Sequence, residues 1–291
     1  GEKMSVLNLK GGGTVYYEIH GEGEPLVLLN GLMMNTLSWV DFIPHLADKF
    51  RLILLDFRDQ GRSSKLPDGY DNDVHVADLM ALFDELKLDK VHLVGTSYGG
   101  QVALKFTIKH QDRLKTLILP NTLSWIPNHL KAIGEGWEEA AQFYDGAKFF
   151  KLAVPWVYSR HFYQDSLEWL TQRQQLFKSL LTKEWFDSIV RLSRSTRNYY
   201  VSPEQLRTIS VPTMLIGAQE DMVTPIDIMS VIHDNIKGCE FVIMYKSGHG
   251  AFLERLNEFV TVICGFVFKH SKSNVTIAAH LSNPVLPGAE E

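Results

Sequence analysis

The chain has 291 residues, of which 45% are apolar and 22% are charged, a composition typical of a globular protein with a large core. Its formal net charge is -5 and no lysine- and arginine-rich block occurs, so no nucleic-acid partner is expected. The longest apolar runs, such as PLVLLNGLMM, are well short of the roughly 18 to 20 residues that span a bilayer, so no membrane span is expected.

Short aliphatic runs alternate with segments of helical period along the first part of the chain. Strands are predicted at Thr14 to Gly21, Pro25 to Asn30 and Phe50 to Phe57, and a helix over Asp73 to Leu88. The segments KVHLVGT, YGGQVALKFTIKH and LKTLILP are then predicted to form a strand, a helix and a strand. Continuous apolar strands separated by helices indicate an α/β fold with a mostly parallel sheet and helices on both faces.

This alternation stops between about Ser124 and Ser202, where helical patterns dense in aromatic residues replace the strands. Strand-like sequence resumes at Pro212 to Ala218 and at Cys239 to Tyr245, and a final helix is predicted from Phe252 to about Lys269. A helical insertion in an α/β core explains this pattern better than a second independent domain.

The expected organisation is therefore one core that carries a lid. The core is expected to comprise residues 1–123 and 203–270, the lid residues 124–202, and a C-terminal tail residues 271–291. The only cysteines, Cys239 and Cys264, lie far apart in apolar segments, which favours buried thiols over a disulfide framework. The first residues lack the apolar segment of a secretory signal, so a cytoplasmic protein is expected.

A serine stands at the junction of the predicted strand KVHLVGT and the helix after it. The segment GTSYG, Gly95 to Gly99, is a G-x-S-x-G pattern in this strand-turn-helix context. A serine in such a sharp turn has strained backbone angles, and the flanking glycines keep Cβ atoms out of the crowded space. The N-terminus of the following helix directs N-H groups to the place where an oxyanion would form. Ser97 is therefore a candidate nucleophile, and a serine that only caps a helix is the structural alternative.

A serine hydroxyl is a weak nucleophile at neutral pH, so it needs a general base and a group that orients the base. Asp221 comes directly after the predicted strand Pro212 to Ala218, and His249 comes after the strand Cys239 to Tyr245. Because the carboxyl ends of parallel strands face the same edge of a sheet, Ser97, Asp221 and His249 can converge there.

Together these segments resemble the α/β-hydrolase family, in its lid-bearing esterase, lactonase and C-C hydrolase branch. The resemblance covers about Val15 to Lys269 and lies in LLNGLMMNTLSW, LLDFRDQGRSS, LVGTSYGG, LIGAQEDMVTP and SGHGAFLE, in the family's order. It implies that Ser97 is the nucleophile, His249 the base and Asp221 the orienting acid. Glu220 is the neighbouring alternative acid.

The oxyanion hole of this family uses two backbone N-H donors. Tyr98 follows the nucleophile, and the resemblance points to Leu32 as the second donor, because NGL matches the family's H-G-x. Asn30 replaces the usual histidine there, and Asp59 replaces the first glycine of D-x-R-G-x-G-x-S. The other polar residues of that motif are expected to stabilise a turn beneath the site: Asp56, Arg58 and Ser63.

The sequence thus predicts a serine hydrolase that cleaves a small, largely apolar carboxylic ester or lactone. Met33 and the lid aromatics Trp156 and Phe162 are candidates for the substrate pocket. A C-C bond hydrolase of vinylogous diketones uses the same triad and stays open, as does a small-molecule sensor on this fold. Neither metal-ligand spacing nor a nucleotide-binding glycine motif occurs, so no metal and no cofactor are expected, and the oligomeric state is left open.

Overall fold

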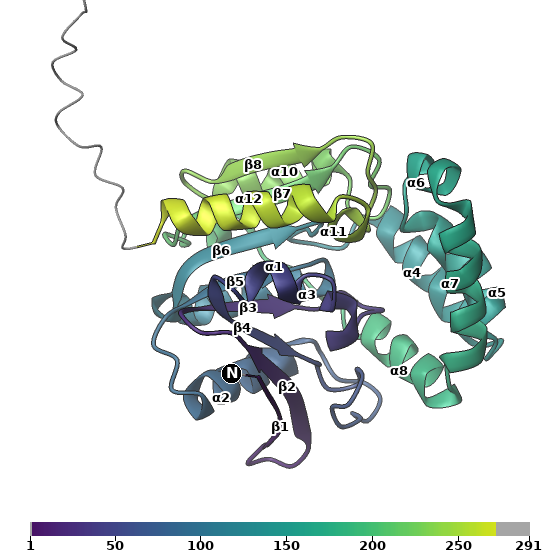
Figure 1. Ribbon diagram of the computed structural model, residues 1–291, viewed down its shortest axis with the longest axis horizontal. Coiled ribbons are helices and arrows are strands. Elements are labelled where there is room, and N and C mark those ends of the chain that lie inside the picture. The colour runs from purple at the N-terminus through teal and green to yellow at the C-terminus, as the bar shows by residue number, and fades with distance from the viewer. Residues whose placement is uncertain (1, 272–291) are drawn as a thin grey trace, which may run out of the picture.

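A computed structural model describes residues 2–271 of the chain, so the predicted tail lies, except for Ser271, outside the described residues (Figure 1). Its strands form one eight-stranded sheet in the order β1-β2-β4-β3-β5-β6-β7-β8. The strands are β1 Lys3–Asn8, β2 Thr14–His20, β3 Glu24–Leu29, β4 Phe50–Leu55, β5 Val91–Gly95, β6 Leu114–Pro120, β7 Thr213–Ala218 and β8 Glu240–Met244.

The sheet is parallel except at the edge where the chain begins. β1 pairs with β2 and β2 with β4 in antiparallel register, and every later pair is parallel. The expected α/β fold with a mostly parallel sheet is therefore confirmed. β1 is an addition that the sequence did not indicate, because its residues are exposed or half-buried and form no continuous apolar run.

Apolar side chains of the central strands alternate between two hydrophobic cores, one on each face of the sheet. In β3, Leu26 and Leu28 pack on the side that includes Phe42 and Phe259, whereas Val27 packs on the opposite side. Each fully buried side chain of this size contributes about 2 kcal/mol by leaving water. This two-sided burial explains why the strands are continuous apolar runs in the sequence.

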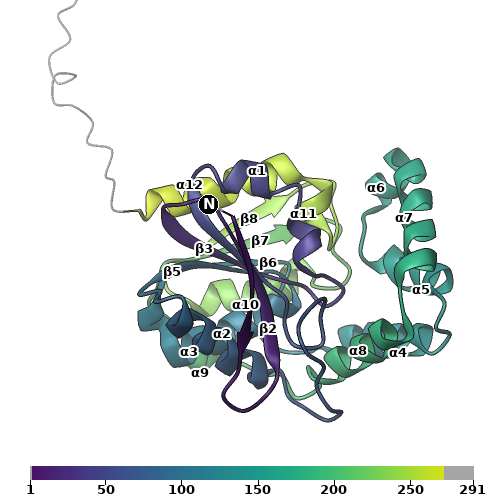
Figure 2. The same ribbon diagram turned by 60° about the horizontal axis from the view of Figure 1, so that its bottom comes forward.

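Helices cover both faces, as Figures 1 and 2 show. On one face lie α2 (Asp73–Glu85), α3 (Tyr98–His110) and α10 (Ile226–Asn235), and on the other α1 (Ile43–Leu46) and α12 (Leu256–Lys269). The core also contains the short helices η1 (Thr36–Trp39), η2 (Gln111–Arg113), α9 (Pro203–Leu206) and α11 (Ala251–Glu254). The single final helix predicted from Phe252 is instead α11 and α12, because Arg255 between them has non-helical angles of φ -131 and ψ 47.

A group of helices separates β6 from β7 in the sequence and stands beside the carboxyl ends of the strands (Figure 1). It comprises α4 (Asn128–Ala141), α5 (Gly146–Ala153), η3 (Val154–Trp156), α6 (Arg160–Asp165), α7 (Leu167–Leu180) and α8 (Lys183–Arg194). We call residues 124–202 the helical insertion. Its two ends are joined, because the N-H of Val201 donates to the carbonyl of Ser124 at 2.7 Å. Among the described helices, none is both long and apolar enough to cross a membrane.

Candidate active site

Ser97 occupies a strained turn between β5 and α3. Its backbone angles are φ 52 and ψ -112, which lie outside the regions that an L-residue ordinarily adopts. The flanking glycines are needed for close packing: a Cβ at Gly95 would lie 2.4 Å from the carbonyl oxygen of Gly99, and a Cβ at Gly99 would lie 2.7 Å from that of Asn30. The pattern G-x-S-x-G therefore produces the turn that presents the Ser97 hydroxyl at the edge of the sheet.

The structure brings the three predicted triad residues together. The Oγ of Ser97 lies 2.8 Å from Nε2 of His249, and Nδ1 of His249 lies 2.9 Å from Oδ2 of Asp221. These residues follow β5, β8 and β7, so the shared carboxyl edge of the parallel strands accounts for their meeting. Asp221 and His249 are buried, at 5% and 9% exposed, while Ser97 is half-buried.

The carboxylate of Asp221 is held by four donors besides His249. Oδ1 accepts the backbone N-H groups of Val223 and Thr224, each at 2.8 Å, and Oδ2 accepts the Thr224 hydroxyl at 2.7 Å and the Asn121 side-chain amide at 2.9 Å. Burial raises the pKa of Asp221, but the charge and hydrogen bond of His249 together with the Thr224 bonds outweigh it, so the pKa is lowered. The buried carboxylate therefore stays ionised.

Asn121 was not indicated by the sequence. It follows β6 with a positive φ of 48°, a conformation that asparagine tolerates better than most residues, and it is completely buried. An asparagine after a strand is common in turns, so its position alone carries no sign of contact with Asp221.

Glu220, the alternative acid, contacts the helical insertion instead of His249. Its carboxylate accepts the backbone N-H and the Nε-H of Arg160 at the start of α6, both at 3.1 Å, and Nδ1 of His161 lies 2.6 Å from it. Burial raises the pKa of Glu220, but Arg160 and His161 outweigh it and lower the pKa. The two adjacent carboxylates thus have different partners.

Two backbone N-H groups beside Ser97 are available as donors. Within residues 2–271, neither the N-H of Leu32 nor that of Tyr98 donates a hydrogen bond to another residue. Gln60 stabilises the loop that carries Leu32, because its Nε2 donates to the carbonyl of Gly31 at 2.8 Å. Asn30, which stands where the family has histidine, donates to the carbonyl of Leu55 at 2.9 Å.

The other departure from the family pattern, Asp59, connects the core to the helical insertion. Its carboxylate accepts two hydrogen bonds from the guanidinium of Arg191 in α8, at 2.8 and 3.1 Å. Asp59 has φ 72, so it adopts the left-handed conformation for which glycine is the usual choice. The remaining polar residues of that motif hold the same loop: Ser63 donates to the carbonyl of Asp56 at 2.6 Å, and Arg58 pairs with Asp78 at 2.7 Å.

Two cavities meet at Ser97, and both are lined by Leu32, Ser97 and Trp137. The first, which we call the apolar chamber, has a volume of about 230 Å³ and includes His249 in its wall. Its remaining wall is mostly apolar, with Met33 and Met34 from the core and Phe150, Trp169 and Phe177 from the helical insertion.

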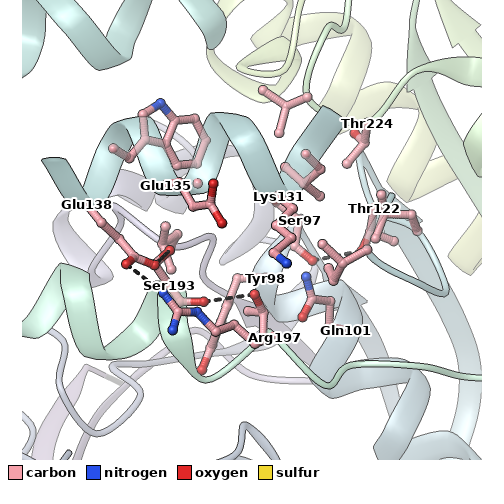
Figure 3. A pocket seen from close by; sticks show the side chains of 18 of the residues that line it. Ser97, Tyr98, Gln101, Thr122, Lys131, Glu135, Glu138, Ser193, Arg197 and Thr224 are labelled. Carbon is pink, nitrogen blue, oxygen red and sulfur yellow. Dashed lines mark hydrogen bonds and ion pairs between the residues drawn. The ribbon is translucent and has the colours of Figure 1, made fainter. Parts of the chain in front are cut away.

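The second cavity, the polar chamber, has a volume of about 340 Å³ and lies between α3 and the helices α4 and α8 (Figure 3). Polar and charged side chains reach into it from both the core and the insertion: Gln101, Thr122, Lys131, Glu135, Glu138, Ser193, Arg197 and Thr224. The two chambers therefore differ in the residue types that line them, although the apolar chamber also has Asp41 and Arg173 in its wall.

Of the pocket residues expected from the sequence, the structure brings only Met33 to a chamber wall. Trp156 packs against His129, with ring centroids 6.0 Å apart, and is 37% exposed. Phe162 packs against Tyr158 inside the helical insertion, with centroids 4.9 Å apart. Trp137, one of many aromatics in that segment, lines both chambers instead.

In the described part of the chain, no three His, Cys, Asp or Glu side chains are grouped so that they could hold a metal ion.

Comparison with known proteins supports the same fold. The family model for the alpha/beta hydrolase fold matches residues 24–256. A solved structure of MGS-M2, an alpha/beta hydrolase from a Medee basin deep-sea metagenome library, is 30% identical with a TM-score of 0.88, and the match covers 94% of this chain and 100% of that chain.

Two curated relatives extend the comparison. The AB hydrolase superfamily protein YisY of Bacillus subtilis is 27% identical, over 87% of this chain and 95% of its own length. The pimeloyl-[acyl-carrier protein] methyl ester esterase of Legionella pneumophila is 25% identical, over 87% of this chain and 99% of its own length. The chain belongs to the α/β-hydrolase family, as the sequence motifs indicated, and it is a hydrolase.

Proposed function

We propose that the protein is a serine hydrolase that cleaves a small, largely apolar carboxylic ester or lactone through Ser97, His249 and Asp221. The hydrogen-bonded chain from the Ser97 hydroxyl through the imidazole to the buried carboxylate, at 2.8 and 2.9 Å, carries this proposal. A base within 3 Å of the nucleophile and an acid that orients the base are the requirements of acyl transfer by serine.

The proposed reaction has two halves. Ser97 Oγ attacks the carbonyl carbon while His249 Nε2 takes the hydroxyl proton, and the N-H groups of Leu32 and Tyr98 bind the oxyanion. The histidine then gives its proton to the leaving oxygen, the carbon-oxygen bond breaks, and an acyl-enzyme remains. In the second half water attacks the acyl carbon, His249 accepts its proton and returns it to Ser97, and the carboxylic acid leaves.

The helical insertion is proposed to act as the lid of this site. It supplies Trp137, Phe150 and Trp169 to the chamber walls, and these aromatic surfaces exclude water from the acyl-enzyme and select substrates by shape. The Legionella relative is named a methyl ester esterase, which favours ester cleavage as the reaction to test first.

The test is a hydrolysis panel of aryl and alkyl esters, thioesters, lactones and vinylogous diketones, run with the wild type and Ser97→Ala. We expect turnover of esters or lactones by the wild type only, and covalent capture of Ser97 by a phosphonylating reagent. Turnover restricted to the diketones would make the protein a C-C hydrolase. Ligand-dependent stabilisation with no turnover of any substrate would contradict the enzymatic proposal and favour a sensor.

A further inference from the structure

The two chambers that meet at Ser97 offer separate spaces for the two parts of the substrate of the proposed reaction. The leaving oxygen takes its proton from Nε2 of His249, so the leaving group has to lie where His249 can reach it. Among the described residues, His249 belongs to the wall of the apolar chamber and not to that of the polar chamber. The acyl part of the substrate is then directed past Ser97 into the polar chamber.

One face of α4 forms a wall of the polar chamber. Leu130, Lys131, Gly134, Glu135 and Glu138 recur at the helical spacing that places them on one side, and all of them line the chamber. Figure 3 shows Lys131 extending from α4 and Gln101 from α3 into the space beside Ser97. Lys131 and Gln101 therefore place polar groups next to the nucleophile.

The amide of Gln101 presents a hydrogen-bond donor to this chamber. The ammonium of Lys105 donates to Oδ1 of Asn72 at 2.6 Å, which leaves the Asn72 amide nitrogen to donate to Oε1 of Gln101 at 2.9 Å. The Gln101 oxygen is thus engaged, and its Nε2-H₂ group has no partner among residues 2–271. Gln101 is only 6% exposed, so this donor is buried apart from its access to the chamber.

Lys131 supplies a second donor with a positive charge. The backbone N-H of Lys131 donates to the carbonyl of Pro127 at 3.0 Å, but its ammonium makes no ion pair or hydrogen bond with another residue in the part of the chain that the structure describes. Glu138 does not compete for it, because its carboxylate already accepts Arg194 at 3.2 Å, Arg197 at 3.0 Å and Ser193 at 2.9 Å. Lys131 is therefore available for a ligand.

The charged side chains that line the chamber are equal in number, two cations and two anions. Lys131 and Arg197 are cationic, Glu135 and Glu138 are anionic, and Arg197 is paired with Glu138 at 3.0 Å. Lys131 and Glu135 are both exposed to solvent, which screens the charges of both side chains. The engaged oxygen of Gln101 leaves only a donor, and a donor beside an ammonium suits a carboxylate rather than an amine.

We propose that Lys131 and Gln101 bind a carboxylate carried by the acyl part of the substrate, at the end away from the scissile carbonyl. The preferred substrates are then half-esters of dicarboxylic acids with an apolar leaving group. This inference rests on the proposed function, because the assignment of the polar chamber to the acyl part depends on His249 acting as the acid that releases the leaving group.

The test compares 4-nitrophenyl half-esters of the dicarboxylic acids from succinate to suberate with 4-nitrophenyl esters of the unbranched monocarboxylic acids of equal carbon number. Each rate is corrected for spontaneous hydrolysis. For at least one chain length we expect the wild type to have a higher kcat/KM for the half-ester than for its neutral counterpart. Replacing Lys131→Met should reduce that preference roughly tenfold to a hundredfold, as expected for the loss of a charge-assisted hydrogen bond.

Two further variants serve as controls. Lys178→Met removes an exposed lysine of α7 that lines neither chamber and should leave both rates unchanged. Glu135→Gln removes an exposed anion from the chamber lining and should keep or increase the preference for the half-ester. A wild type that prefers the neutral ester at every chain length, an unchanged preference in Lys131→Met, or a reduced preference in Glu135→Gln would overturn the inference.

A binding measurement separates this inference from the proposed function. Calorimetric titration measures the binding of adipate and of hexanoate to the wild type and to Lys131→Met, and it requires no turnover. We expect adipate to bind more tightly than hexanoate and the variant to lose that difference. If neutral esters are hydrolysed but adipate shows no advantage, only the carboxylate site is wrong. If no ester is hydrolysed although adipate binds through Lys131, the proposed function fails and the site stands.

Discussion

The side-chain amide of Asn121 donates a 2.9 Å hydrogen bond to Oδ2 of Asp221, the same oxygen that faces Nδ1 of His249. Asn121 comes from the end of β6 and Asp221 from the loop after β7, so neighbouring strands position the acid jointly. The oxygen that orients the imidazole thereby accepts hydrogen bonds from both Asn121 and the Thr224 hydroxyl. Asn121 is a positioning residue in this arrangement, since it touches the acid and not the proposed nucleophile.

Asn121→Gly should lower kcat by roughly tenfold, the effect of removing one hydrogen bond to a charged group. Glycine tolerates the positive φ of this position, so the substitution isolates the loss of the side chain from backbone strain. KM for a neutral ester should change little, because Asn121 lines neither chamber. Steady-state kinetics check this, and an unchanged kcat would show that Thr224 and the backbone donors suffice.

Ser97→Ala should fold like the wild type and lose nearly all hydrolytic activity. The hydroxyl contributes little packing, and removing the nucleophile of a serine enzyme can cost on the order of a millionfold in rate. Turnover and the melting temperature are measured on the same preparations. Retention of more than a few per cent of wild-type turnover in a clean preparation would rule out Ser97 as the nucleophile.

Asp221→Asn should impair catalysis severely, by about ten-thousandfold, because an amide favours the wrong tautomer of His249. Glu220→Gln is the matched control, since the adjacent carboxylate contacts Arg160 and not the imidazole. Its kcat should stay within a few-fold of the wild type. Comparable losses in the two variants, or a larger loss at Glu220, would transfer the role of the acid.

Glu254 predicts a pH-dependent difference in stability. Burial raises the pKa of its carboxyl although Ser159 and the N-H of Gly248 donate to it. A folded-state pKa above the unfolded value means that the native state binds the proton more tightly, so this group's contribution to stability is lost as pH rises.

Relative to the wild type, Glu254→Gln should therefore gain stability as pH increases through that raised pKa. Melting temperatures of both proteins from about pH 4 to about pH 8 give the difference. Glu258→Gln, at an exposed position of α12, should show no such trend. A difference for Glu254→Gln that is constant with pH, or that falls as pH rises, would contradict the linkage.

Trp137 should control substrate shape, because its ring lines both chambers next to Ser97. Trp137→Leu should change the ratio of kcat/KM between short and long acyl esters, while Ser97 still reacts with a small phosphonylating reagent. Trp156→Leu is the comparison, since Trp156 lies against His129 outside both chambers. An equal change in both variants would mean that aromatic residues of the insertion act through its stability and not through contact with substrate.

The residues of the proposed triad could be found from the sequence because each one has a local signal. Ser97, Asp221 and His249 each follow an apolar run that reads as a parallel strand, and such strands deliver their carboxyl ends to one edge whatever the details of packing. The glycines around Ser97 add a turn that few other residues can form. The same logic predicted most strands of the sheet, and it missed β1, whose exposed residues produce no apolar run.

The side chains that surround Ser97 could not be predicted from the sequence. Aromatic residues occur on several faces of the helices in the insertion, and the packing of α4, α5 and α7 on one another determines that Trp137 faces the nucleophile while Trp156 and Phe162 do not. The donor of Gln101 likewise depends on a chain of contacts through Asn72 and Lys105 that no sequence spacing encodes. The alternation of strands with helices and the turn chemistry are local and periodic signals, which is why the fold class and the three residues at the sheet edge could be predicted from the sequence. The chamber walls combine segments far apart in the chain, and their composition follows from packing alone.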